Sequence, residues 1–137
     1  MIYDVLEKKL FDANIGLSES NVFREYMPAD IKSGVLIRSP LSGIKIDPNI
    51  PGWYKPRLQM IVRHHDIEAG INLAGQVVKA VRVEKSEIHE QTENGRVRVA
   101  IFTPEHLPIQ FPRSDGNGIE WSINFTTAFA FISPWQM

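Results

Sequence analysis

The longest regular pattern in the chain is an alternation of apolar and polar or small residues from Ile119 to Phe131. The odd positions are apolar or Thr, and they are Ile119, Trp121, Ile123, Phe125, Thr127, Phe129 and Phe131. The even positions are Glu120, Ser122, Asn124, Thr126, Ala128 and Ala130. Because successive side chains of an extended chain point to opposite faces, this pattern predicts a long strand with one buried face. A shift of one residue would expose the whole apolar set, so its register is firmly set.

An amphipathic helix is predicted at the start of the chain, over residues 2 to 15. The turn Asn14-Ile15-Gly16 is expected to end it, because glycine tolerates the left-handed conformation of a helix C-terminus. Its apolar stripe consists of Ile2, Val5, Leu6, Leu10 and Ile15. The pattern favours packing of this stripe on the sheet over a partner-binding role.

A second helix is predicted to follow Asp66, a natural N-cap, and Glu68 in its first turn favours the helix dipole. Its predicted apolar stripe consists of Ile67, Ile71, Ala74, Val78 and Val81. The small residues Gly70 and Gly75 are expected to let this helix approach the sheet closely. Its end is placed near Val83.

Shorter patterns predict further strands. Residues 34 to 39 predict a short buried strand that ends before Pro40, and residues 57 to 64 predict a second strand with Leu58, Met60 and Val62 on one face. A short extended segment is expected over residues 21 to 26. Asn94-Gly95 is a strong hairpin dipeptide. After it, apolar and other positions alternate, with Val97, Val99 and Ile101 on one face and Arg96, Arg98 and Ala100 on the other.

Two long connections, residues 41 to 55 and 104 to 118, are rich in proline and glycine. Connections of this length in a compact domain are more often functional or flexible. Trp53 and Tyr54 lie at the end of the first connection. An aromatic pair there either anchors a protein interface or caps the edge of the sheet, and the sequence leaves both interpretations open.

Length and composition predict a single domain over residues 1 to 137. The 137 residues, of which 43% are hydrophobic, suffice for one core, and no repeat or linker divides them. The predicted fold class is α+β, with a mostly antiparallel sheet of four to six strands and two main helices packed on one face.

Charge and cysteine content exclude several classes of protein. The 15 basic and 16 acidic side chains give a net charge of −1, which argues against nucleic-acid binding by bulk electrostatics. The absence of cysteine excludes disulfides, thiolate catalysis and cysteine-based metal sites, and it fits cytoplasmic synthesis. No apolar run approaches the ~18 to 20 residues of a membrane span, and the N-terminus lacks the order of a signal peptide.

No catalytic, cofactor or metal site is predicted. His64-His65-Asp66 is the strongest metal candidate, but adjacent strand residues point to opposite faces and do not converge. The run from Arg113 to Gly118 has the Asp, Asn and Gly content of a calcium loop. It lacks the acidic spacing and the distal Glu, so a tight turn is favoured. Phosphate-binding loops, GxSxG and HExxH are absent. The residues favour a structural or binding protein over an enzyme.

Two stretches together carry a family resemblance. Tyr54-Lys55-Pro56-Arg57-Leu58-Gln59-Met60-Ile61-Val62-Arg63 precedes the helix opening Asp66-Ile67-Glu68-Ala69-Gly70. Later, Pro108-Ile109-Gln110-Phe111-Pro112-Arg113 precedes Asp115-Gly116-Asn117-Gly118 and the aromatic closing strand. In this order, over residues 1 to 132, the chain resembles the small minor capsid and tail-terminator (tail-completion) proteins of long-tailed bacteriophages.

The resemblance implies a mixed α+β fold and a structural role in the virion, in the tail or neck, after synthesis in the host cytoplasm. Tail terminators form a ring, typically hexameric, that stops polymerisation of the tail tube and presents a surface to the filled head. The implied partners are further copies of the chain, the tail tube protein and a head-tail connector protein, with no membrane and no cofactor. A head-completion or connector protein of the neck is the alternative. A stand-alone binding module or small enzyme with an accidental resemblance is the third hypothesis.

A ring of identical subunits needs two different, complementary surfaces on each subunit. Loops on a rigid sheet commonly provide such surfaces, and the helix-free face of the sheet is a further candidate. The candidate interface residues are Ile50, Trp53, Tyr54, Phe111, Arg113 and Asp115. Arg96 and Arg98 either line a channel in weak contact with passing DNA or form a solvated strand face, and the second interpretation is favoured.

Overall fold

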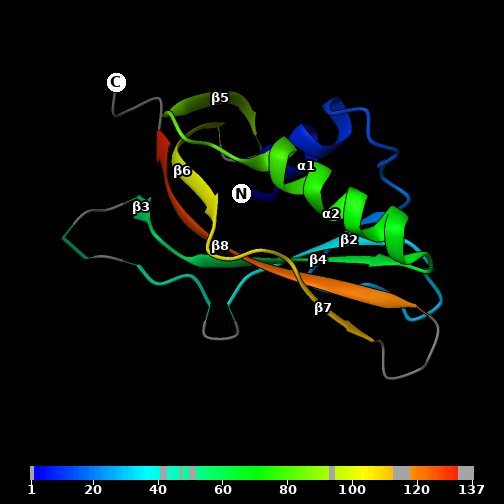
Figure 1. Cartoon of the computed structure of the whole chain (residues 1–137). Coiled ribbons are helices and arrows are strands. Elements are labelled where there is room, and N and C mark those ends of the chain that lie inside the picture. Colours follow the sequence, from blue (N-terminus) through cyan, green and yellow to red (C-terminus); the bar gives the residue numbers. More distant parts are fainter. Residues whose placement is uncertain are drawn as a thin grey trace.

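The computed structural model of the chain (Figure 1) describes residues 2–40, 43–46, 48–49, 52–92, 95–112 and 118–132. Over these residues it contains two helices, α1 (Ile2–Asp12) and α2 (Ile67–Val81). The strands are β1 (Val22–Arg24), β2 (Gly34–Arg38), β3 (Trp53–Tyr54), β4 (Arg57–His64), β5 (Glu87–Thr92), β6 (Gly95–Pro104), β7 (Ile109–Pro112) and β8 (Ile119–Ile132). The class is α+β, as predicted.

All eight strands belong to one sheet with the order β1-β2-β4-β8-β6-β5, and β3 and β7 each pair with β8. The sheet is larger than the predicted four to six strands, and it is mixed because β1 runs parallel to β2. The prediction missed β3, β5 and β7, which are short or lie in segments rich in polar residues. Their hydrogen bonds come from neighbours distant in sequence, which a local pattern does not reveal.

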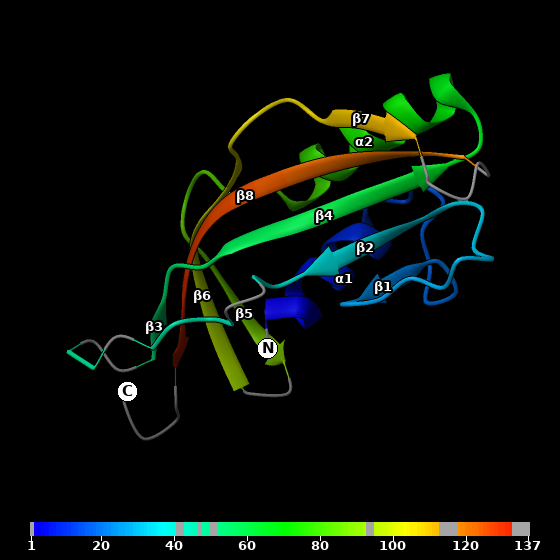
Figure 2. The same ribbon diagram turned by 90° about the horizontal axis from the view of Figure 1, so that it is seen from below.

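Strand β8 is the centre of the sheet, and Figure 2 shows its long curved course beside β4. On one side it pairs with β4 over residues 119–126 and with β3 at residues 129–130. On the other side it pairs with β7 over residues 119–122 and with β6 over residues 125–132. The predicted alternation is confirmed at its centre, where Trp121, Ile123 and Phe125 are buried. Strand β8 therefore connects the two halves of the sheet.

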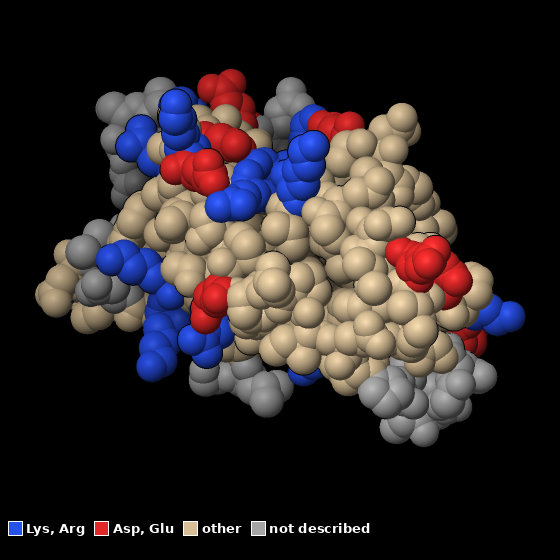
Figure 3. All heavy atoms as spheres, viewed as in Figure 1, with Lys and Arg blue, Asp and Glu red and all other residues tan. Residues whose placement is uncertain are grey.

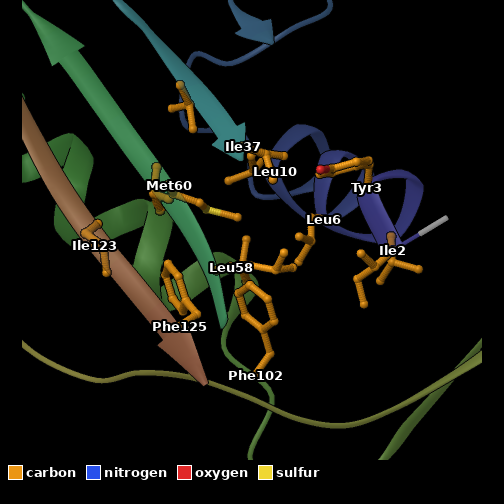
Figure 4. Close-up of a cluster of buried hydrophobic side chains, with 14 of the residues drawn as sticks. Ile2, Tyr3, Leu6, Leu10, Ile37, Leu58, Met60, Phe102, Ile123 and Phe125 are labelled. Carbon is orange, nitrogen blue, oxygen red and sulfur yellow. The ribbon is translucent and has the colours of Figure 1, made fainter. Parts of the chain in front are cut away.

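The main core lies between the two helices and the face of the sheet that carries the odd-numbered residues of β8. Figure 4 shows α1 contributing Leu6 and Leu10 to this core, opposite Leu58 of β4. The rings of Phe102 and Phe125 stack in it with centroids 4.6 Å apart. The opening helix ends at Asp12 and Asn14 adopts a left-handed conformation, close to the predicted stop.

A smaller apolar cluster lies on the opposite face of β2 and β4, where Met27 packs with Leu36 and Ile61. Beside it, the Arg63 guanidinium is buried and donates to Glu120 Oε2 at 2.9 Å and to the carbonyls of Pro28 and Ile31. Residues 27–31 therefore cover this part of the sheet, held by one buried arginine.

The predicted apolar stripe of α2 is partly wrong. Ile67 and Ile71 are 48% and 51% exposed, and the residues that face the core are Gly70, Ala74, Val77 and Val81. Gly70 is buried and lets Trp121 pack against the helix backbone, as expected. Gly75 is exposed, and a Cβ at this position would have no atom within 4 Å, so it does not bring the helix closer to the sheet. The Asp66 N-cap is confirmed, since its carboxylate accepts a hydrogen bond from the Ala69 amide at 2.9 Å.

The predicted register of β6 holds only for its first half. Val97 and Val99 are buried, but a bulge between Val99 and Ile101 shifts the pairing with β8. A bulge inserts one extra residue and so exchanges the faces of the residues that follow. Phe102 therefore enters the core in place of Ile101, which is half-buried. Thr92 pairs with Gly95, so β5 and β6 form a hairpin, while Asn94 of the predicted turn dipeptide lies outside the described residues.

Candidate functional site

The register of the sheet assigns the predicted interface residues to faces. Trp53 pairs with Ala130 and Phe111 with Glu120, both even positions of β8. Arg98 also pairs with Ala130, and Arg96 pairs with Ile132. All four side chains therefore lie on the face of the sheet opposite the helices, because paired residues share a face. We call the part of this face over β3, β6, β7 and β8 the open face.

Tyr54 is the exception. It pairs with Phe129, an odd position, and so points toward the helix side of the sheet. Its half-buried ring packs on the rings of Phe129 and Phe131, with centroids 5.4 and 5.7 Å away. In this structure Tyr54 contacts the aromatic end of its own sheet. Ile50, Arg113 and Asp115 lie outside the described residues, so their predicted roles stay predictions.

Strand β7 gives the open face an apolar edge. Ile109 and Phe111 are 55% and 36% exposed and lie opposite Ser122 and Glu120, while Leu107 before the strand is 86% exposed. Within the part of the chain that the structure describes, β7 is paired only with β8, so its other edge has no neighbouring strand. An unpaired strand edge with exposed apolar side chains is a template for contact with another chain.

A groove of about 470 Å³ lies where β3 leads into β4. We call it the basic groove, since three cationic side chains and an indole line it, together with prolines and Ile46. Its residues are Pro40, Gly43, Lys45, Ile46, Trp53, Lys55, Pro56 and Arg57. Figure 3 shows Lys and Arg side chains gathered at the lower left of the molecule, below the place of β3 in Figure 1.

The cations of the basic groove differ in their partners. Arg57 donates to Glu105 Oε2 at 2.9 Å, which offsets part of its charge. Lys45 and Lys55 are exposed and form no ion pair with any residue that the structure describes. Ile46 in the same groove is 75% exposed. The groove therefore offers uncompensated positive charge beside apolar surface, which suits an acidic partner with apolar side chains.

Arg96 and Arg98 lie on the open face of β6. Arg98 is exposed, whereas Arg96 is half-buried with its Nε 3.5 Å from Glu90 Oε1. The nearby carboxylate weakens the positive potential of Arg96. Contact with passing DNA stays a prediction.

The histidine cluster does not form a metal site in the described part of the chain. The rings of His64 and His65 stack with centroids 4.7 Å apart, so the expectation that they point to opposite faces is wrong. His64 ends its strand and His65 lies in the bend that follows, where strand alternation no longer applies. His64 Nδ1 accepts a hydrogen bond from the Asp66 amide at 3.0 Å. No group of three His, Asp or Glu side chains among the described residues could hold a metal ion.

The comparison with protein families decides the identity. The family model described as "Bacteriophage tail terminator protein" matches residues 9–131, which is most of the chain. The chain belongs to this family. The resemblance inferred from the sequence is thereby confirmed at the level of the family. No curated protein matches the sequence.

As a member of the tail terminator family, the protein is a structural component of the bacteriophage virion, and the family is not an enzymatic one. Neither described helix is long and apolar enough to cross a membrane. The open face and the basic groove are the candidate functional surfaces that the geometry of this tail terminator offers.

Sequence reasoning missed part of both surfaces. Leu107, Ile109 and Phe111 alternate with other residues, which is the signal of a strand with one apolar face, but prolines at 104, 108 and 112 suggested an irregular connection. For the basic groove, the near-adjacent Lys55 and Arg57 were a signal. Their approach to Lys45 depends on the fold of the connection before β3.

Proposed function

We propose that this family member acts as a terminator that caps the completed tail tube as a ring, which the resemblance predicts to be hexameric, and provides the surface for joining to the head. The proposal rests on the family match and on one structural observation. The residues Trp53, Arg98, Ile109 and Phe111, which come from three parts of the chain, share the open face. A sheet face with exposed apolar side chains and an unpaired edge suits contact with further protein subunits.

In this proposal the partners are other copies of the chain, the tail tube protein and a connector protein of the head. Residues 27–31 cover the β2 and β4 part of the helix-free side, so the open face is the part proposed for a partner. Arg96 and Arg98 are proposed to contact passing DNA weakly, since Glu90 lies beside one of them.

Electron microscopy of particles from cells that lack this protein tests the role. Overlong tails without heads are expected, because nothing would stop polymerisation of the tube. Tails of normal length that fail to join heads would instead assign the protein to the head-completion or connector class. Unaltered particles would contradict any role in the virion.

A pair of variants tests the open face. Ile109→Asp with Phe111→Asp places charge on the open face, whereas Gln110→Asp places it on the other side of the same strand, opposite Trp121. All three side chains are exposed, so both proteins are expected to fold. Loss of tail capping in the double variant alone supports the open face. Normal capping by a folded double variant would exclude it.

A further inference from the structure

The start of α2 carries a surface whose chemistry is complementary to the basic groove. Ile67 and Ile71 are 48% and 51% exposed and lie one helical turn apart. Glu68 lies on the same side of the helix, is exposed, and has no ion-pair partner among the described residues. Asp66 adds a second carboxylate at the N-cap. This part of the helix thus combines negative charge with apolar side chains.

The basic groove offers the matching groups. Lys45 and Lys55 carry positive charge without a described partner, and Ile46 and Trp53 supply apolar surface in the same groove. Each of the two surfaces therefore has exposed apolar side chains. Each also carries charged side chains that form no ion pair with a described residue. Opposite charges around an apolar centre favour one docking arrangement and disfavour others.

The two surfaces of one molecule cannot meet. Strand β4 separates them, since Lys55 and Arg57 lie at its start and α2 begins three residues after its end at His64. The eight residues of this strand span about 23 Å. Figures 1 and 2 both show β3 and the start of α2 at opposite ends of the molecule. Figure 3 shows acidic side chains at the right, where α2 begins, far from the basic group at the lower left.

We propose that the start of α2 of one subunit docks in the basic groove of the next subunit. Glu68 faces Lys45 and Lys55, and Ile67 and Ile71 cover Trp53 and Ile46. Because the two surfaces differ, the contact is head-to-tail, the kind that closes into a ring or continues as a filament. This inference rests on the proposed ring-forming function and names the contact that builds the ring.

A charge exchange in the full-length chain tests the contact. We expect two variants to weaken self-association about tenfold or more, because like charges then meet in the contact. The first is the double variant Lys45→Glu with Lys55→Glu, and the second is the single variant Glu68→Lys. Mixing the two variant proteins should restore association, since each surface then meets a partner of opposite charge. Analytical ultracentrifugation over a range of concentrations measures the association, with tail tubes added if the chain alone stays monomeric.

Lys32→Glu with Lys85→Glu is the matched control, because it makes the same change in net charge at exposed lysines outside the groove. It should associate like the unaltered chain. Equal association of the groove variant and this control would overturn the contact while leaving the ring intact. A groove variant that still associates but no longer joins heads would also overturn the contact, and it would assign the groove to another partner. An unaltered chain that never associates, even on tubes, would refute the proposed ring itself.

Discussion

Gly70 of α2 lies against the ring of Trp121 in β8 so closely that a Cβ at residue 70 would come 2.1 Å from Cη2 of the indole. Trp121 is only 2% exposed and lies in the main core. The helix thus approaches the sheet closely at a buried position that has no side chain. The distance between helix and sheet depends on this pair.

Gly70→Ala is therefore expected to destabilise the protein by about 1–3 kcal/mol, because the added methyl group forces the buried indole or the helix to move. Urea denaturation followed by tryptophan fluorescence measures the change. Gly75→Ala is the control, since no atom lies within 4 Å of a Cβ there. It should stabilise the helix by up to about 1 kcal/mol. Equal effects of the two substitutions would contradict the close contact.

The buried Arg63 leads to a second prediction about stability. Its replacement by Met removes the ion pair to Glu120 and two hydrogen bonds to the 27–31 segment. A loss of about 3 kcal/mol is expected, because the Glu120 carboxylate, whose side chain is only 15% exposed, is left without its partner. Lys8→Met breaks the exposed pair to Asp12 and should cost less than about 0.5 kcal/mol. Thermal denaturation of the two variants measures both losses of stability. Similar losses would contradict a larger contribution from the buried arginine.

The register of β8 predicts opposite outcomes at two adjacent positions. Phe125 is fully buried and stacks on Phe102, so Phe125→Asp places an unpaired charge in the core and should prevent folding. Thr126 is exposed, and Thr126→Asp should yield a folded protein. Circular dichroism and solubility distinguish the two variants. A folded Phe125→Asp protein would mean that the faces are assigned wrongly.

Tyr3 predicts how stability depends on alkaline pH. Burial, and then its hydrogen bond to Glu25, raise the pKa of Tyr3 to about 12 from its ordinary value of 10. A tyrosine whose pKa is higher in the folded than in the unfolded protein stabilises the folded protein fully at pH values below its unfolded pKa. This contribution to stability is lost as the pH rises from about 10 to 12. Absorbance at 295 nm should show a tyrosine that ionises near pH 12, and Tyr3→Phe should remove it. Its persistence in that variant would assign it to another residue.

Several features of this tail terminator follow from local sequence. The alternation in β8, the spacing of α1 and the Asp66 cap each involve neighbours within a few residues, and the structure confirms all three. These features are predictable because side-chain periodicity and capping depend on the local backbone. The sequence alone also supported the family, which the match over residues 9–131 confirms.

Other features were decided only by tertiary structure. Ile67 and Ile71 fit the apolar period of α2, yet they are exposed because Gly70 and Trp121 turn another side of the helix to the sheet. The bulge in β6 brings Phe102 into the core through its pairing with β8. The basic groove likewise joins Lys45 to Lys55 across a folded connection. The sequence determined which segments are regular, while contacts between distant segments decided which of their faces are covered, because burial depends on what packs opposite.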